Sequence, residues 1–294
     1  MKLATAIRRY EAQLRADGKS PHTREVYLRD LESFADWIGR STNISRITPH
    51  HLARYLTTPT FTHMPSGQPR AVVSMNRSKS ALRSFFRFLT DAGHLKQNPA
   101  RLVRSAPCSQ KPPSCLTEKE TWRLLATIKC CKTIIAVRDH LMFALMLGTG
   151  MRLGSLVGLN VGDVDLASGT LRINGKGNVE QLVFVNGGLK RLLKKHLDKR
   201  DPTDPLFLSV RGRRIGSRQV QLRLEHWLKE AGITRPCAVH TLRHTFATRL
   251  YEKTGDLRLV QRALGHRHVT TTEIYSQVAD ARVRRAVRLL GSTR

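Results

Sequence analysis

Several features that define other classes of protein are missing from this sequence. It has no apolar stretch long enough to span a bilayer, and its first residues contain no apolar core of the kind found in secretory signals. It also has no internal repeat and no low-complexity tract. We therefore expect neither a membrane protein nor a repeat protein, and we expect the chain to work in the cytoplasm.

Cysteine is scarce as well. The five residues are Cys108, Cys115, Cys130, Cys131 and Cys237, an odd number in which two are adjacent. Their spacing does not match a metal site, and the odd count argues against a disulfide framework. We therefore expect the cysteines to be reduced thiols, and we expect no bound metal.

Acidic residues are few: 22 Asp and Glu stand against 51 Lys and Arg, giving a net charge of +29. This excess is far larger than solubility requires and indicates a polyanionic partner. Nucleic acid is favoured over a membrane surface, because no helical segment has the strongly apolar face that lipid binding requires. Residues 1–117 hold 19 of the basic and 7 of the acidic residues, so both parts of the chain are basic and both are expected to contact the nucleic acid.

At 294 residues the chain can hold two domains with separate cores. In residues 1–104, four segments carry apolar residues at helical spacing, and Ser20-Pro21 and Thr48-Pro49 have the composition of helix N-termini. A small all-α domain is therefore predicted. The four apolar stripes are Leu3, Ile7, Tyr10 and Leu14; Tyr27, Leu31, Phe34 and Ile38; Leu52, Tyr55 and Leu56; and Leu82, Phe85, Phe86 and Leu89.

A basic stripe lies between the apolar positions of the last of these helices. It consists of Arg77, Lys79, Arg83 and Arg87. Plain solvation would explain it, but the overall charge favours contact with DNA phosphates. We predict that these four residues face DNA.

Residues 105–116 contain three prolines and are predicted to form an extended linker. The second domain, residues 117–294, begins at a capping box formed by Thr117 and Glu120. It is mainly helical, with one change of period. Residues 170–174 and 181–185 flank a Gly-Lys-Gly-Asn turn, which predicts a β-hairpin with Lys176 at its tip.

The residues that carry chemistry are concentrated near the end of the chain. On a helix, His240, Arg243 and His244 share one face. Gly265 ends the next periodic run, His266 follows it, and a tyrosine stands at 275. A cation, imidazoles and a phenol without paired carboxylates suit chemistry on an anion. In so basic a chain, a DNA phosphodiester is the obvious anion.

Taken in order, these motifs resemble those of the tyrosine recombinases, the phage-integrase and Xer-like family. Thr149-Gly150-Met151-Arg152-Leu153 resembles the motif of the first catalytic arginine, and Gly175-Lys176-Gly177-Asn178 resembles the turn with the catalytic lysine. The order continues with His-x-x-Arg-His from His240, Leu-Gly-His, and Tyr275. The resemblance implies a four-helix, SAM-like core-binding domain over residues 1–104 and an α+β catalytic domain over residues 117–294.

The resemblance also implies the roles of the residues. Tyr275 is the nucleophile that forms a 3′-phosphotyrosine and releases a 5′-hydroxyl, with His240 as its base and Lys176 as the acid. Arg152, Arg243 and His266 bind the phosphate oxygens. Neither metal nor cofactor is expected, since cations take the place of metal ions. His244 is assigned a structural role.

Two departures from the family pattern stand out. Ser155 occupies the position where an acidic residue usually braces the first arginine, so Arg152 is expected to be held differently. Val179 and Gln181 follow the lysine where further basic residues are common, which predicts weaker DNA contact by the hairpin. Neither change removes a catalytic group.

Three functions fit the motifs. The first is a site-specific recombinase for integration, excision or resolution, acting as a homo-tetramer, or with a related recombinase, on double-stranded DNA with an inverted-repeat core site. The second is a DNA-relaxing enzyme similar to type IB topoisomerases, and the third is a catalytically silent DNA-binding relative. The N-terminal helices and the compact length favour the recombinase, and the intact catalytic set argues against the silent relative. A zinc protease is rejected, because Thr241 stands where that motif needs glutamate after His240.

Overall fold

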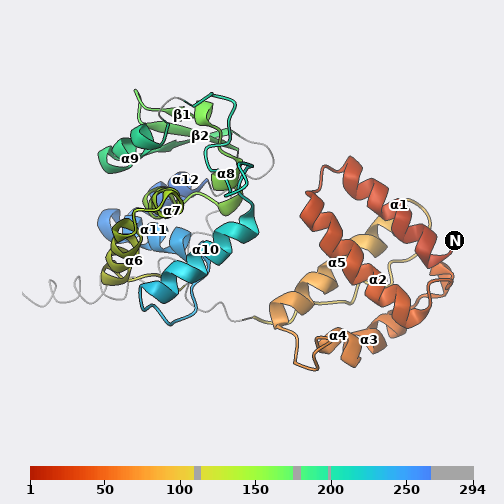
Figure 1. Ribbon diagram of the computed structural model, residues 1–294. Helices are drawn as coiled ribbons and strands as arrows, with labels where there is room; N and C mark the ends of the chain where they lie inside the picture. Colours follow the sequence, from red (N-terminus) through yellow and green to blue (C-terminus); the bar gives the residue numbers. More distant parts are fainter. Residues whose placement is uncertain (109–113, 175–179, 198–199, 266–294) are drawn as a thin grey trace, which may run out of the picture. The chain divides into compact units, whose positions relative to one another are not determined.

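A computed structural model describes residues 1–108, 114–174, 180–197 and 200–265. The chain divides into two compact units, Met1–Gln110 and Lys111–Arg294, each with its own hydrophobic core (Figure 1). Helices dominate both units, and a small antiparallel sheet lies in the second. This confirms the prediction of a mainly α chain with two cores and a β-hairpin.

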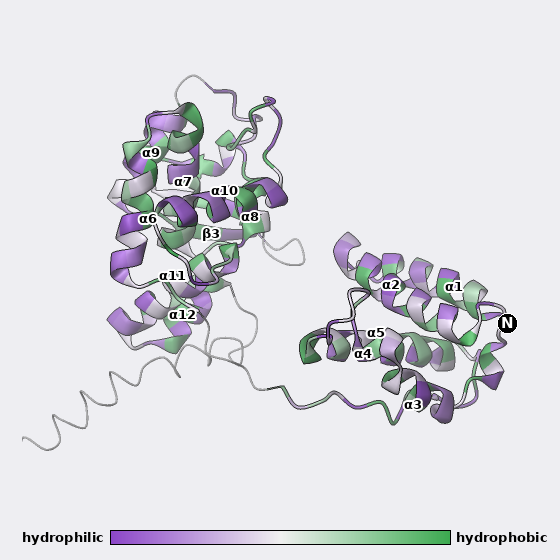
Figure 2. Cartoon of the chain, turned by 60° about the horizontal axis from the view of Figure 1, so that its bottom comes forward, coloured by the Kyte–Doolittle hydropathy of each residue, from purple (hydrophilic) through white to green (hydrophobic). Residues whose placement is uncertain are grey.

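The N-terminal unit is built from amphipathic helices around an aromatic core. Edge-to-face pairs join Phe34 to Tyr55 and Phe85 to Phe86, with ring centroids 5.1 and 5.0 Å apart. The helices carry both hydrophobic and hydrophilic residues along their length, as their one-sided burial requires (Figure 2). The elements are α1 (Leu3–Ala16), α2 (Pro21–Ile38), the 3₁₀ turn η1 (Ile44–Arg46), α3 (Pro49–Thr57), the short α4 (Pro59–Thr62) and α5 (Val72–Asp91).

Local capping explains where two of these helices begin. The hydroxyl of Ser20 accepts a hydrogen bond from the backbone N–H of Thr23, and Pro21 occupies the first position of α2. At α3, Thr48 and His51 exchange bonds reciprocally between side chain and backbone. Both starts agree with the sequence prediction.

The C-terminal unit is organised around α7, which is buried along most of its length and contacts α6, α9 and α11 (Figure 1). Within the described ranges, no helix is both long and apolar enough to cross a membrane. The elements are α6 (Glu118–Cys130), α7 (Ile134–Thr149), α8 (Leu153–Gly158), the 3₁₀ turn η2 (Val161–Asp163), β1 (Val164–Asp165), β2 (Thr170–Asn174), β3 (Glu180–Phe184), α9 (Gly187–Leu197), α10 (Ser217–Glu230), α11 (Val239–Thr254) and α12 (Leu257–Leu264).

The sheet has the order β1-β2-β3 and is antiparallel throughout its described strands. In the hairpin, Leu171 pairs with Val183 and Ile173 with Gln181, so these side chains share one face. Leu171, Ile173 and Val183 are buried in the core. The sequence predicted the hairpin but missed β1, because a strand of two residues has no period to detect.

A buried ionic cluster joins α7 to α10. Asp139 is fully buried, and one of its oxygens accepts bonds from Arg223 Nε at 2.6 Å and Trp227 Nε1 at 2.8 Å. Its other oxygen accepts a bond from Arg138 Nη2 at 2.7 Å. Such a cluster holds the two helices in one register, because the buried carboxylate of Asp139 accepts hydrogen bonds from side chains of both α7 and α10.

Candidate active site

The turn that carries Arg152 depends on a glycine. α7 ends at Gly150, whose backbone is left-handed (φ 65°), and its N–H donates to the Met146 carbonyl at 2.9 Å. A Cβ at position 150 would collide with the ring of Phe246 on α11. The close approach of α7 and α11 therefore requires glycine here. Two residues later, the extended backbone of Arg152 forms the N-cap of α8.

Arg243 ties this turn to the end of α12. Its side chain is buried at 3% exposure on α11. Nη1 donates to the carbonyl of Gly150 at 2.7 Å, and Nη2 donates to the carbonyl of Leu264 at 2.8 Å. One guanidinium thus holds two segments that are far apart in the sequence and that lead to Arg152 and to His266.

Two imidazoles lie beside this guanidinium. The rings of His240 and His244, one turn apart on α11, are perpendicular with centroids 4.8 Å apart. His240 lies at the surface, and its pKa is lowered first by the partial burial of its ring and then by the charges of Arg243 and Arg152. Burial, followed by the two neighbours His240 and Arg243, lowers the pKa of His244 to about 4. Both rings are therefore neutral at neutral pH, and a neutral ring can accept a proton.

Three of the six residues predicted to be catalytic, Arg152, His240 and Arg243, lie in the described ranges, and the structure brings them together. The other three, Lys176, His266 and Tyr275, lie outside the described residues. The apolar spacing of residues 281–290 predicts a further helix, and this segment also lies outside the described residues. The two guanidinium groups and the imidazole form a positive site suited to an anion. In the described part of the chain, no three His, Cys, Asp or Glu side chains gather as a metal site would require.

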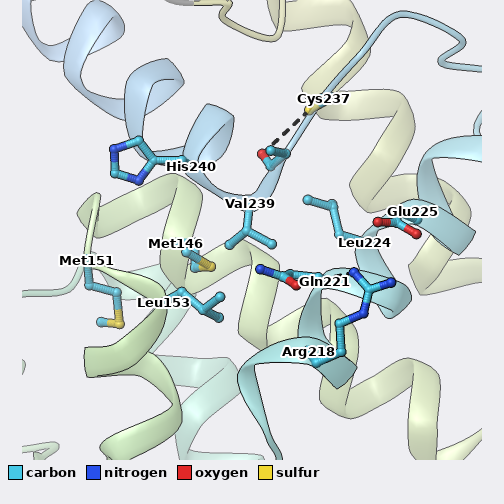
Figure 3. A pocket seen from close by; sticks show the side chains of 11 residues that line it. Met146, Met151, Leu153, Arg218, Gln221, Leu224, Glu225, Cys237, Val239 and His240 are labelled. Carbon is cyan, nitrogen blue, oxygen red and sulfur yellow. Dashed lines mark hydrogen bonds between the residues drawn. The ribbon is translucent and has the colours of Figure 1, made fainter. Parts of the chain in front are cut away.

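A cavity of about 480 Å³ opens beside His240, between α7, α8, α10 and the start of α11. Its apolar wall includes Met146, Met151 and Leu224, and its polar wall comes from α10 (Figure 3). The polar residues are Arg218, Gln221 and Glu225. Sequence reasoning missed this polar wall, although polar residues at helical spacing on an otherwise amphipathic segment were a visible signal.

The hairpin meets α12 through Gln181. Its side-chain N–H group donates to the carbonyls of Arg262 and Ala263, both at 3.4 Å. Gly265 has a left-handed backbone (φ 62°) and ends α12, as the sequence predicted. A Cβ on Gly265 would collide with the Gln181 amide. Sequence reasoning interpreted Gln181 only as a missing DNA contact, and no local pattern could have paired it with a helix about eighty residues later.

The basic stripe predicted to face DNA is partly engaged within the protein. Arg77 forms an ion pair with Asp30, Nε to Oδ2 at 3.1 Å. Arg83 donates to the carbonyl of Val103 at 3.2 Å and thereby holds the chain that follows α5. The other two members differ, since Lys79 is half-buried and Arg87 is exposed. DNA contact by this stripe stays a prediction.

Comparison with known proteins identifies the family. Residues 114–282 match the phage integrase family, and residues 7–93 match the N-terminal SAM-like domain of phage integrases. The tyrosine recombinase XerC of Thermodesulfovibrio yellowstonii is 35% identical over 273 residues, which cover 89% of this chain and 87% of the relative. The XerC of Vibrio vulnificus is 37% identical over 272 residues, with 90% and 84% coverage.

A solved structure shares the fold. The XerH site-specific recombinase, in its post-cleavage complex with a palindromic difH substrate, superposes with a TM-score of 0.74 at 23% identity, over 96% of this chain and 85% of that one. The SAM-like domain followed by an α+β catalytic domain is thus confirmed. The chain belongs to the phage integrase family and is a tyrosine recombinase, an enzyme that cleaves and rejoins DNA.

Proposed function

We propose that this protein recombines double-stranded DNA at a specific inverted-repeat core site through a 3′-phosphotyrosine formed by Tyr275. One observation carries the proposal. Arg152 at the start of α8 and His240 and Arg243 in the first turns of α11 meet at one positive site, where the Arg243 guanidinium already binds the backbone carbonyls of Gly150 and Leu264. The positive side chains are therefore already ordered in the folded protein, and DNA binding does not have to order them.

The arginines act on the charge that develops during cleavage. In-line attack on the phosphodiester places charge on the non-bridging oxygens and on the departing 5′ oxygen. Arg152 and Arg243 donate to the non-bridging oxygens, and His266 adds a further hydrogen bond. Arg243 has five N–H groups, and its bonds to Gly150 and Leu264 each engage one of them.

Proton transfer completes the step. A free phenol has a pKa of about 10 and is protonated at neutral pH, so Tyr275 needs a base. Neutral His240 accepts that proton, while Lys176 protonates the departing 5′ oxygen. Rejoining reverses both transfers: a 5′-hydroxyl attacks the phosphotyrosine and Tyr275 leaves. The bond energy is kept in the phosphotyrosine, so no nucleotide is consumed.

The DNA is held by both domains, which we place at residues 1–104 and 117–294 with a linker at 105–116. Both carry excess positive charge, and Arg77, Lys79, Arg83 and Arg87 of the first are proposed to contact phosphates. Solved relatives include a lambda integrase dimer on its core site and a tetramer on a Holliday junction. We propose a homo-tetramer, or a pairing with a related recombinase, on cytoplasmic DNA.

Covalent capture tests the function. The protein is incubated with fragmented genomic DNA of its source and denatured, and the DNA ends linked to protein are sequenced. We expect a small set of sites with inverted repeats. A nicked suicide substrate built on such a site should give a denaturant-resistant adduct with the wild type and none with Tyr275→Phe. The matched control Tyr251→Phe, which removes the hydroxyl of a tyrosine on α11, should give the adduct like the wild type. Relaxation of a supercoiled plasmid without the site would support the topoisomerase instead, and no adduct from the wild type would support the silent relative.

A further inference from the structure

The end of α12 is gripped from two sides. Arg243 holds the carbonyl of Leu264, and Gln181 donates to the carbonyls of Arg262 and Ala263. The last carbonyls of a helix have no partner within the helix, so they accept such outside donors readily. The next residue after Gly265 in the sequence is His266.

We propose that Gln181 is a positioning residue for DNA cleavage, which fixes the end of α12 and through it the placement of His266. The inference rests on the proposed catalytic role of His266. In this proposal β3 has a second role besides forming one side of the hairpin with Lys176: through Gln181 it holds the end of α12 in place.

The contact between Gln181 and the end of α12 fixes the position of the helix end more than it stabilises the fold. Both bonds are 3.4 Å long, so each contributes little to stability. The position of the end of α12 is instead fixed by close packing, because Gly265 lies so near the Gln181 amide that no Cβ fits between them. Gln181 itself is fixed through its register with Ile173, which is buried in the core. A small shift here would move the chain leading to His266, and cleavage rates are sensitive to such shifts.

A phosphate contact is the competing role for a polar side chain on this hairpin. Gln181 lies on the same face of the sheet as buried Val183 and is half-buried, whereas its neighbours Leu182 and Phe184 face solvent at 59% and 76% exposure. Its donor group is directed at helix carbonyls. Its loss should therefore change the rate of cleavage and leave DNA affinity intact.

The first test compares three variants of the full chain on the suicide substrate in single turnover. Gln181→Ala removes the amide, Gln181→Glu keeps its shape but can only accept hydrogen bonds, and Leu182→Ala is the matched change on the exposed face. At saturating DNA we expect both Gln181 variants to cleave roughly tenfold to a hundredfold more slowly, and Leu182→Ala to match the wild type. Half-site affinity should stay within about twofold for all three, since no phosphate contact is lost.

The second test distinguishes an effect of Gln181 on the end of α12 from an effect on Lys176. A 5′-bridging phosphorothiolate leaves without a proton, so it should rescue Lys176→Ala but not Gln181→Ala. Combining Gln181→Ala with His266→Ala should add little to the defect of His266→Ala alone, as expected for residues that act through one another.

Three outcomes would overturn the proposal: wild-type cleavage by Gln181→Glu, a loss of DNA affinity that accounts for the slower cleavage, or rescue of Gln181→Ala by the phosphorothiolate. Thermal melting guards against misfolding, with a shift below about 4 °C expected for the alanine variant. Failure of the proposed function itself looks different, because the wild type would then form no adduct.

Discussion

The guanidinium of Arg243 donates a hydrogen bond to the carbonyl of Gly150 at 2.7 Å. One predicted phosphate-binding arginine thus fixes the turn that leads to the other, Arg152. A second bond, to Leu264, extends the same grip to α12. Arg243 is therefore both a proposed phosphate ligand and a residue that holds the backbone of the site. Because it has two roles, we expect its substitution to lower the cleavage rate more than the loss of one phosphate contact would.

Arg243→Lys should abolish most cleavage. A lysine keeps the charge but has no planar fork, so it cannot hold two carbonyls and a phosphate together. We expect the single-turnover rate on the suicide substrate to fall by ~10²–10³-fold or more. Arg249→Lys makes the same chemical change six residues further along α11, at a residue that donates to Thr117 and Thr121, and should cleave normally. Equal rates for the two variants would contradict this reading.

Gly150→Ala should destabilise the C-terminal domain. Its left-handed backbone disfavours a side chain, and the added Cβ would meet the ring of Phe246. Backbone strain of this kind costs about 1–3 kcal/mol before the collision is counted. The measurement is the midpoint of urea unfolding. Gly154→Ala is the control, because a Cβ there meets nothing within 4 Å, and a shift of the same size in both would refute the steric argument.

Asp139→Asn should destabilise the same domain more strongly. The substitution leaves the guanidinium groups of Arg138 and Arg223 beside a neutral amide, and breaking a buried ionic cluster typically costs about 3–5 kcal/mol. Asp201→Asn, at an exposed carboxylate of the same unit, should leave the unfolding midpoint unchanged. A midpoint for Asp139→Asn equal to that of the control would show that the cluster does not hold α7 to α10.

The pH dependence of cleavage should reflect the lowered pKa of His240. As a base it works only when neutral, and burial with the charges of Arg243 and Arg152 keeps it neutral below its ordinary pKa of 6.5. The single-turnover rate should therefore stay level as pH falls to 6.5 and decline only below that value. His240→Gln should be slower throughout and lose this decline. A decline beginning above pH 6.5 in the wild type would assign the base elsewhere.

The sequence by itself determined the long helices and the hairpin of this fold, because helix and strand periods are local, but it did not reveal the two-residue β1. The stripe of Leu82, Phe85, Phe86 and Leu89 became the buried face of α5, and Gly265 ended α12 as its composition indicates. Motif order alone also identified the family. It named Lys176, His266 and Tyr275, whose catalytic roles rest on that order because these residues lie outside the described ranges.

Tertiary structure alone decided how the site is held. No local pattern links Arg243 to Gly150, or Gln181 to the end of α12, because these pairs are about eighty or more residues apart and meet only after the core has formed. The lowered pKa of His240 has the same origin, since it depends on the partial burial of the ring and on how near Arg243 and Arg152 come. Residue identity therefore specified which groups are present, while packing decided their distances, their burial and hence their protonation.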